Sequence, residues 1–550
     1  MEVSDLPQLV RNAGRLNEVV AVLLKYGIAP WLRNVNADWV QRHLSSRDGT
    51  KIGDVTQPVR VRMALTELGT TFIKLGQILS TRADLVGIEM AQELSNLQSD
   101  TPPDAPADVI QTITEELGEP PEQLFAQFDS TAFASASIGQ VHHAVLQDGT
   151  AVVVKVQHRS IEDRIRNDLE ILIEMARLAA SYSDEIARYN PVDVATEFRR
   201  TMLAELDFTG EQRNLLRFAA NFESDPTIQF PAPQPALCSR RVLTMQAFVG
   251  ISVSQRDRLI QSGYDLEDIA RRGADMFLQM VFRDGFYHAD PHPGNLMVLT
   301  DAVIGVLDAG MVGRVDDEFR EQTEDLLVAA IDKDPDRLLD GVMQLGDVPA
   351  DLDRARLRSD LTEFIDQYSS QSIDQFDLRG ALIGMVEMIR RHHILLPSRV
   401  SQLIKMIVML EGTAQQLSPS FTLVELLQPY RTQAIERRLS PQRMWRKLSG
   451  MHRDWSRLLD TMPRDITDIL NRVRRGSFDV HLEHRRLDSI ANRLVLGLLT
   501  AALFVGSTSL LSNQVHPLLY DTSIPGAIGC ASAVYLGLKL IAAIKHSGNI

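Results

Sequence analysis

Three polar side chains between residues 288 and 310 have the types and spacing that magnesium-dependent phosphoryl transfer requires. The segment reads HADPHPGNLMVLTDAVIGVLDAG, so Asn295 follows Asp290 after four residues and Asp308 ends an apolar run. Phosphoryl transfer uses a carboxylate that orients the nucleophile or accepts its proton, and hard oxygen ligands that hold Mg²⁺ against nucleotide phosphates. The pattern therefore predicts a catalytic Asp290 and a magnesium site formed by Asn295 and Asp308.

The spacing matches that of protein kinases, whose catalytic segment reads H-R-D-x-x-x-x-N and whose metal segment reads D-F-G. Here residues 288–295 form the first segment, with Ala289 in place of Arg, and residues 308–310 form the second, with Ala309 in place of Phe. A D-x4-N pattern alone arises by chance in a long chain. The prediction of a nucleotide site therefore depends on further residues upstream.

The two histidines of this segment, His288 and His292, allow another interpretation, because residues four apart share a helix face. Zinc enzymes use such a pair within an H-E-x-x-H helix. Pro291 and Pro293 disfavour a continuous helix here, so zinc is the lesser alternative.

A lysine in a strand-like run supplies the cation that a nucleotide site needs. Lys155 lies in AVVVKVQ, where a buried ammonium group is costly unless a carboxylate pairs with it. The lysine that binds phosphates in protein kinases has the same setting. We expect Glu205, in a helical pattern downstream, to be its catalytic partner, and Glu197 is the competing candidate. The alternative is a lysine that extends to solvent from an edge strand.

A turn rich in small residues precedes the lysine strand, where a kinase has its glycine-rich phosphate loop. Alanine restricts the backbone more than glycine does, so we expect a stiffer loop and atypical nucleotide binding. Met245, near the expected hinge, is also predicted to contact the nucleotide. The loop residues predicted to bind it are Ala134, Ser135, Ala136, Ser137, Ile138, Gly139 and Gln140.

The elements that must position these residues are mostly helical. Apolar residues recur at three- and four-residue spacing through the first hundred residues, at 161–220 and again from residue 256 onward. Residues 133–157 instead read as a β-hairpin with an Asp-Gly turn, and another strand follows at 241–249. We therefore predict a helix-rich α+β fold.

In their order along the chain these motifs resemble the AarF/UbiB family of atypical kinases, over approximately residues 60–420. The family's K-x-G-Q motif is present as KLGQ at 74–77, and ELD at 205–207 precedes HADPHPGN. The resemblance implies a two-lobed, protein-kinase-like fold in which helices carrying the regulatory residues Lys74 and Gln77 pack across the mouth of the active site. It also implies an ATPase or small-molecule kinase in ubiquinone or other isoprenoid-lipid metabolism.

Lys74 and Gln77 share one helix face and would project together toward phosphates or acidic residues. The alternative is a solvated helix face weakened by Gly76. The chain departs from the family pattern at Ser135 and at Gln246, where an acidic residue is frequent. These departures leave the preference for adenine open.

The C-terminal part combines a basic segment with two apolar stretches. From Arg431 to Arg493 there are 15 Arg or Lys against 8 Asp or Glu, and residues 494–511 and 525–544 carry one charge, Lys539. A membrane-spanning helix needs about 20 residues, so we predict a transmembrane helical hairpin, with a buried soluble hairpin as the alternative. The flanking arginines predict a cytoplasmic location at the inner membrane, where the basic segment would contact anionic lipid.

The composition narrows the class of protein. Lys and Arg total 57 against 72 Asp and Glu, a net charge of −15, which disfavours nucleic acid as a partner. The two cysteines are too few for a thiolate zinc cluster or a disulfide framework. The predicted divisions are an N-terminal helical segment (1–58), the K-x-G-Q extension (59–125), an N-lobe (126–250), a C-lobe (251–430), the basic segment (431–493) and the hairpin (494–544).

Together these observations predict a membrane-anchored kinase or ATPase that binds ATP and Mg²⁺. Lys155 would hold the phosphates, and Asp290 would orient the acceptor or water. Asn295 and Asp308 would bind the metal. The expected partners are membrane lipid, isoprenoid-quinone precursors and quinone-biosynthesis proteins, the pathway being implied by the resemblance alone. A nucleotide-binding pseudokinase scaffold and a protein Ser/Thr kinase are the alternatives.

Overall fold

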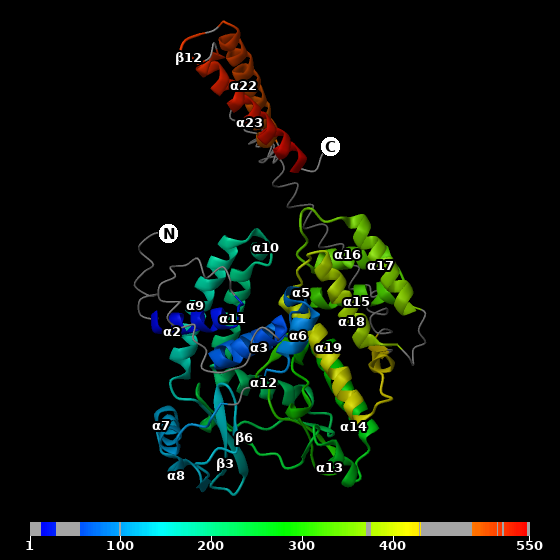
Figure 1. Cartoon of the computed structure of the whole chain (residues 1–550). Helices are drawn as coiled ribbons and strands as arrows, with labels where there is room; N and C mark the ends of the chain where they lie inside the picture. The colour runs from blue at the N-terminus through cyan, green and yellow to red at the C-terminus, as the bar shows by residue number, and fades with distance from the viewer. Residues whose placement is uncertain are drawn as a thin grey trace, which may run out of the picture. The chain divides into compact units, whose positions relative to one another are not determined.

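The computed structural model describes most of the chain, which divides into two compact units, Met1–Ser440 and Pro441–Ile550. Helices predominate in both units (Figure 1), and the predicted helix-rich α+β character is confirmed. The described residues are 13–28, 55–97, 101–369, 376–427, 429–430, 487–513, 515–519 and 522–546.

The first unit begins with a helical extension. Its helices are α2 (Ala13–Lys25), α3 (Gln57–Leu68), α4 (Thr70–Leu79), α5 (Ala83–Val86) and α6 (Ile88–Leu94). Gly69 separates α3 from α4 and Gly87 separates α5 from α6, with φ values of 90° and 82° that residues with a side chain rarely adopt. An apolar core that includes Leu68, Phe72 and Leu94 packs these helices together.

The N-lobe is built on an antiparallel sheet with the strand order β1-β3-β4-β6, and β2 pairs with β3. The strands are β1 (Gln127–Phe128), β2 (Ala134–Ser135), β3 (Gly139–Val145), β4 (Ala151–Gln157) and β6 (Val242–Gln246). Lys155 of β4 lies opposite Val141 on one side and Leu243 on the other, so its strand is an interior one. The edge-strand alternative is therefore wrong. Met245 pairs with Val153 and is buried.

The helices of this part of the chain are α7 (Pro106–Leu117), α8 (Pro121–Leu124), α9 (Ile161–Tyr182), α10 (Asp184–Ala187), α11 (Pro191–Glu205) and α12 (Phe208–Asn221). Of these, α7, α8 and α12 contact strands of the sheet. Val152, Val154 and Val156 pack in one core with residues of α7. Because side chains alternate along a strand, Lys155 points to the opposite face. That face shares a core with α12, which carries Phe208.

The C-lobe is largely helical, and its helices α14 and α19 run side by side (Figure 1). Their bounds and those of their neighbours are α13 (Arg256–Gln261), α14 (Leu266–Phe282), α15 (Asp317–Ile331), α16 (Pro335–Leu345), α17 (Arg354–Ser369), α18 (Leu378–Arg391) and α19 (Ser398–Leu417). The large apolar core runs from the N-lobe through α14 to α19.

Short strands between α12 and α15 carry the catalytic segment. They pair as β5-β10-β9-β7 and β8-β11. Their bounds, with those of three 3₁₀ turns, are β5 (Ile228–Gln229), η4 (Pro235–Leu237), β7 (Ile251–Ser252), β8 (Phe286–His288), η5 (Pro293–Asn295), β9 (Leu296–Val298), η6 (Thr300–Ala302), β10 (Ile304–Val306) and β11 (Val312–Arg314). Asp290 thus follows β8, and Asp308 lies between β10 and β11.

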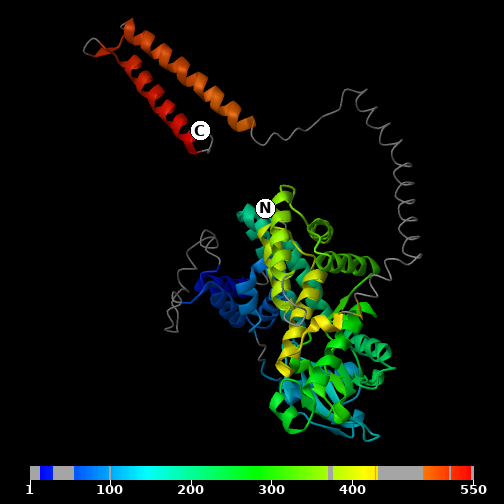
Figure 2. The same cartoon turned by 90° about the vertical axis from the view of Figure 1, so that its right-hand side faces the viewer.

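The second unit is a hairpin of two paired helices (Figure 2). Its elements are α22 (Leu487–Ser512), β12 (Leu518–Leu519), β13 (Thr522–Ser523) and α23 (Ile524–His546). The first predicted span is part of a longer helix that also contains the charged residues Asp488 and Arg493. Within the ranges that the structure describes, no helix is both long and apolar enough to cross a membrane. The predicted transmembrane hairpin is not supported.

Candidate active site

The residues predicted to perform chemistry in the second half of the chain lie in connected turns. Nδ2 of Asn295 donates to Oδ2 of Asp290 at 3.1 Å and to the carbonyl of Asp290 at 3.2 Å. The side-chain carbonyl oxygen of Asn295 is then its remaining ligand atom. Oδ1 of Asp308 accepts from the backbone N–H of Gly310 at 2.5 Å, which fixes the carboxylate.

His288 joins the two turns. Its Nδ1 accepts from the backbone N–H of Asp290 at 3.0 Å, and its Nε2 lies 2.6 Å from the carbonyl of Asp308. An accepting Nδ1 and a donating Nε2 define the neutral tautomer. His292 instead accepts from Gly294 through Nδ1. Among the described residues, no group of three or more His, Cys, Asp or Glu could hold a metal ion, so the zinc alternative has no support.

Lys155 forms its ion pair with Glu211 and not with Glu205. Its Nζ lies 2.7 Å from Oε2 of Glu211 and 5.1 Å from the ring centre of Phe208. The predicted pairing with Glu205 is wrong because the pattern read as one helix is two. The chain turns at Asp207, whose Oδ1 accepts from the first turn of α12, and Glu211 then faces β4.

Glu205 pairs instead with Lys74 of the K-x-G-Q motif. The Nζ–Oε2 distance is 2.9 Å, and the two side chains are only 16% and 12% exposed. The pair joins α4 of the extension to the end of α11. Nε2 of Gln77 donates to the carbonyl of Leu97 at 3.0 Å and so fixes the chain that leaves α6. Glu197, the competing candidate, accepts from a serine at the start of α19.

The charges of both lobes and of the extension act on one another. Burial alone would lower the pKa of Lys155, but Glu211 and Asp308 raise this pKa above its ordinary value. Burial also opposes the rise in the pKa of Lys74, which is produced by Glu205 and then by Asp308. The pKa of Asp308 is lowered, against the effect of burial, first by Lys155. At neutral pH the site therefore holds cationic lysines around an ionised Asp308.

The alanine-rich turn is a tight hairpin. Ser135 pairs with Gln140, and the backbone N–H of Ala136 donates to the carbonyl of Gly139 at 2.9 Å. The side chain of Ile138 packs in the large core and not toward solvent. Along the turn, Ala134 and Ala136 are exposed, Ser135 is half-buried, and Ser137, Ile138, Gly139 and Gln140 are buried.

Polar contacts fix this turn to the chain that leaves the extension. The backbone N–H of Asp104 donates to Oε1 of Gln140 at 2.6 Å, and Oδ1 of Asp104 lies 3.1 Å from Nδ1 of His158. Nε2 of His158 lies 3.0 Å from the carbonyl of Ala136. Nε2 of Gln140 lies 2.9 Å from Nε2 of His142. The Gln140 amide, predicted to bind the nucleotide, is thus engaged within the protein.

The extension also contacts the C-lobe, at the start of α19. Arg82 and Asp84 form a buried ion pair of 2.8 Å. Arg82 donates to the carbonyl of Leu396 and to Oγ of Ser398, both at 3.0 Å. Asp84 accepts from the Leu396 N–H and from Oγ of Ser401, both at 3.3 Å. We refer to these five residues as the α5–α19 clasp. With the Lys74 ion pair, it makes the extension a bridge between the lobes.

Two charged residues of the site were not predicted from the sequence, Glu211 and Lys405. Lys405 lies on α19 and is half-buried. Burial lowers its pKa, Asp290 opposes that shift, and the charge of Lys74 adds to it. The helix cap at Asp207 is a signal that would have located Glu211. No local motif distinguishes Lys405 from other helical lysines.

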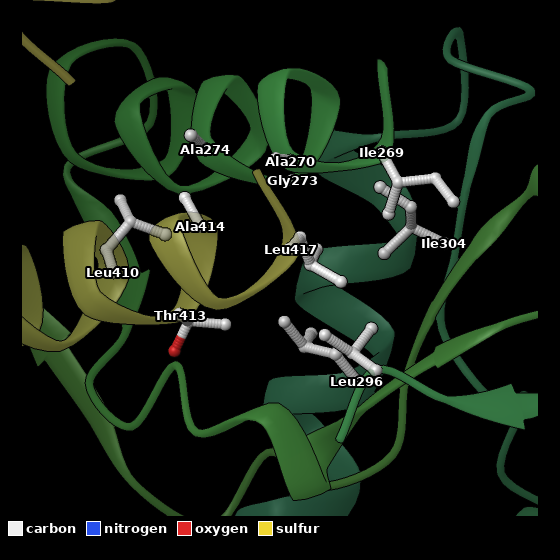
Figure 3. A pocket seen from close by; sticks show the side chains of 11 residues that line it. Ile269, Ala270, Gly273, Ala274, Leu296, Ile304, Leu410, Thr413, Ala414 and Leu417 are labelled. Carbon is white, nitrogen blue, oxygen red and sulfur yellow. The ribbon is translucent and has the colours of Figure 1, made fainter. Parts of the chain in front are cut away.

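A small apolar cavity lies behind the catalytic segment, between α14 and α19 (Figure 3). Thr413 lines it and donates to the carbonyl of Pro291 at 3.0 Å. Its volume of about 20 Å³ has room for little more than one water molecule. A cavity of this volume is too small for a nucleotide. Its lining is Val253, Ile269, Ala270, Gly273, Ala274, Leu296, Ile304, Leu410, Thr413, Ala414 and Leu417.

Comparison with protein families finds three matching segments. Residues 96–341 match the ABC1 atypical kinase-like domain, residues 361–422 match the UbiB helical domain, and residues 481–546 match the ABC1/UbiB kinase-like C-terminal domain. The first match contains the predicted site residues Lys155, Asp290, Asn295 and Asp308. The second contains α19.

Full-length relatives show the same similarity. A probable protein kinase UbiB of Pseudomonas aeruginosa is 34% identical over 448 residues, covering 80% of this chain and 83% of that protein. Its counterpart in Azotobacter vinelandii is 33% identical and covers 87% and 88%. An uncharacterized protein from the hydrogenase 1 5′ region of Clostridium pasteurianum is 28% identical and covers 98% and 99%. Among solved structures, the Rv3197–erythromycin complex from Mycobacterium tuberculosis is 23% identical with a TM-score of 0.44, and the match covers 64% of this chain and 90% of that one.

Proposed function

The chain belongs to the ABC1/UbiB family of kinase-like proteins, and from this premise we propose that it is an atypical kinase or ATPase that uses Mg-ATP. At the level of the family this implies ubiquinone biosynthesis, and we extend the proposal to related isoprenoid-quinone or prenyl-lipid metabolism. The observation that carries it is electrostatic. Asp308 acts on both Lys155 and Lys74, and His288 ties the Asp308 turn to Asp290.

In the proposed reaction, the bond between the γ-phosphorus of ATP and the β,γ-bridging oxygen breaks, and ADP leaves with the bonding electrons. A bond forms from that phosphorus to an acceptor hydroxyl or to water, and the displaced proton passes to Asp290 and then to solvent. Asn295 and His288 hold Asp290 for this role. Lys155, positioned by Glu211, binds the phosphates of the nucleotide.

The residues present fit a magnesium nucleotide. The carboxylate of Asp308 and the side-chain carbonyl of Asn295 are hard oxygen donors of the kind that Mg²⁺ prefers, and phosphates would supply further ligands. When bound, Mg²⁺ neutralises charge that develops on the phosphates during transfer. The lowered pKa of Asp308 keeps its carboxylate ionised at neutral pH. The chemistry of the donor set therefore agrees with this cofactor.

Phosphate release by the purified full-length protein tests the proposal. We expect Mg²⁺-dependent hydrolysis of ATP that falls by about 10²-fold or more in Asp290→Asn and in Asp308→Asn. Asp301→Asn is a matched control, because Asp301 is exposed and its φ of 57° is one that asparagine tolerates. Wild-type protein without turnover, or active-site variants as fast as wild type, would contradict the enzyme.

The same preparation separates the alternatives. We favour water or a small acceptor, because the extension is tied to α11 by Lys74 and Glu205 and to α19 by the α5–α19 clasp. Transfer of labelled phosphate to added polypeptides at a rate comparable to hydrolysis would favour a protein Ser/Thr kinase. Nucleotide binding without any release would favour a pseudokinase scaffold.

We also propose membrane lipid as a partner, on the basis of the charge of residues 431–493. Of these, residues 431–486 lie outside the described residues. Basic residues near an anionic surface contribute about 1 kcal/mol each at low ionic strength. Flotation with anionic and with neutral liposomes, at low and at high salt, measures this. Equal binding to both kinds of liposome would argue against a charge-driven contact.

The metabolic role requires a test in cells. Isoprenoid quinones would be profiled after deletion of the gene and after complementation with wild type or with Asp308→Asn. We expect quinone to fall on deletion and to recover with wild type alone. Full recovery with the variant would separate the metabolic role from phosphoryl transfer. A location at the cytoplasmic face of the inner membrane and contacts with quinone-biosynthesis proteins are further parts of the proposal.

A further inference from the structure

Helix α19 passes beside the candidate active site and is fixed at two points. Near its start, Oγ of Ser401 contacts Oδ1 of Asp84 at 3.3 Å within the α5–α19 clasp. Near its end, Oγ1 of Thr413 donates to the carbonyl of Pro291, the residue after Asp290, at 3.0 Å. Lys405 lies between these contacts, one helical turn after Ser401 and on the same face. The helix therefore holds Lys405 between the extension and the catalytic segment.

Lys405 differs from the other two lysines of the site in its partners. Lys74 has Glu205 at 2.9 Å and Lys155 has Glu211 at 2.7 Å. Within the described part of the chain, the ammonium group of Lys405 forms no hydrogen bond or ion pair. The charges that act on it are those of Asp290 and Lys74.

A half-buried ammonium group that has no carboxylate partner loses part of its hydration, and an anion is the usual compensation. Asp290 is near enough to act on Lys405 but is not in contact with it, and its Oδ2 already accepts from Asn295. The charge of Lys74 also repels Lys405, and none of the carboxylates that pair with the other two lysines contacts it. This arrangement is suited to receive an anionic group next to the catalytic carboxylate.

We propose that Lys405 binds the terminal phosphoryl group of the nucleotide, the group that is transferred, so that α19 contributes a residue of the active site. The proposal rests on the proposed function and names a contact within that site. Asp290 marks the acceptor end of the site, whereas Lys155 and Asp308 lie at its nucleotide end. A cation beside Asp290 would meet the γ-phosphate, and charge spreads over the oxygens of this group during transfer.

Comparison of Mg-ATP with Mg-ADP tests this contact, because only ATP has the terminal phosphoryl group. Calorimetric titration of Lys405→Met should show an affinity for Mg-ATP that is about tenfold or more below that of wild type, with the affinity for Mg-ADP within twofold. The turnover number should fall by about 10²-fold. Lys405→Arg should recover most of the affinity for Mg-ATP, which a purely structural role would not require.

Arg399→Met is the matched control, because Arg399 lies on the same helix but is exposed and pairs with Asp316. It should bind both nucleotides and turn over ATP as wild type does. Thermal unfolding of each variant identifies a loss of fold, and Lys405→Gln replaces the methionine variant if that variant is unfolded.

The outcomes for Lys405 and for the enzyme are separable. Active wild type together with a Lys405→Met that binds ATP and ADP as wild type does overturns the Lys405 contact alone. Wild type that releases no phosphate, but whose preference for Mg-ATP over Mg-ADP is lost in Lys405→Met, supports the contact and overturns the proposed activity. Wild type that binds neither nucleotide overturns both.

Discussion

Lys74 and Glu205 form a mostly buried ion pair, 2.9 Å long, that joins the K-x-G-Q helix of the extension to the end of α11 in the N-lobe. A second pair, Lys155 with Glu211, lies in the same electrostatic environment, since Glu205 also acts on Lys155. The extension is therefore part of the charge distribution of the site.

Removal of one member of the Lys74 pair should destabilise the first unit. Lys74→Met leaves Glu205 buried without its cation, and Glu205→Gln leaves Lys74 without its anion. Breaking a mostly buried pair in this way costs about 3 kcal/mol. We expect each variant to lower the midpoint of thermal unfolding, and the double variant to lose less than the sum of the two. Strictly additive losses would show that the pair is not coupled.

Glu211→Gln should impair turnover more than the same change at Glu205 or Glu197. Glu211 is the carboxylate in contact with Lys155, so its loss leaves that ammonium group poorly oriented toward the phosphates. We expect kcat to fall by about 10²-fold. Glu197→Gln is the control, since an amide oxygen still accepts from Ser398. If Glu205→Gln impaired kcat while Glu211→Gln did not, the assignment of the pairs would be wrong.

Gly139→Ala should destabilise the N-lobe. A methyl group at this position would lie 2.6 Å from the carbonyl oxygen of Val156 and 3.2 Å from the ring of Phe208. Since the nearest of these atoms belongs to the backbone, β3 must shift, at a cost of about 1–3 kcal/mol. Gly14→Ala is the control, because Gly14 lies in a helix and a methyl group added there would meet no atom outside the backbone of that helix within 4 Å. Circular dichroism during thermal unfolding measures both variants.

Asp308 should make the folded state sensitive to acid. Its pKa is lowered in the folded protein, so its ionised form stabilises the fold above the unfolded value of about 3.9. That contribution is lost as the pH falls through the lower folded pKa. Unfolding midpoints of wild type and Asp308→Asn between pH 7 and pH 3 should therefore converge at the acid end. A difference that stays constant across this range would contradict the sign of the shift.

Local patterns in the sequence predicted Lys155, Asp290, Asn295 and Asp308 as site residues, because each lies in a short segment whose residue types are tied to its chemistry. The strand run around Lys155 also predicted its setting, and the structure places it in an interior strand. The partner of Lys155 could not be predicted in the same way. One capped turn at Asp207 changes which carboxylate faces the strand.

Lys405 shows a second limit of sequence analysis. Its position beside Asp290 depends on how α19 packs along the catalytic segment, through contacts such as Thr413 with Pro291. Residues more than a hundred positions apart carry no common local pattern. The apolar C-terminal stretches show a third limit, because hydropathy predicted the hairpin of two helices that the structure contains, but also predicted that it crosses a membrane, and no described helix is both long and apolar enough for that.

The α5–α19 clasp joins residues that are more than 300 positions apart in the chain. During synthesis, Arg82 and Asp84 leave the ribosome long before Leu396, Ser398 and Ser401 have been translated. Domains generally fold from the N-terminus as they emerge, so the extension must spend that interval without its C-lobe partner. A nascent chain interrupted before α19 would therefore carry every kinase-like motif and still lack the clasp, which joins the extension to the C-lobe only after Ser401 has left the ribosome.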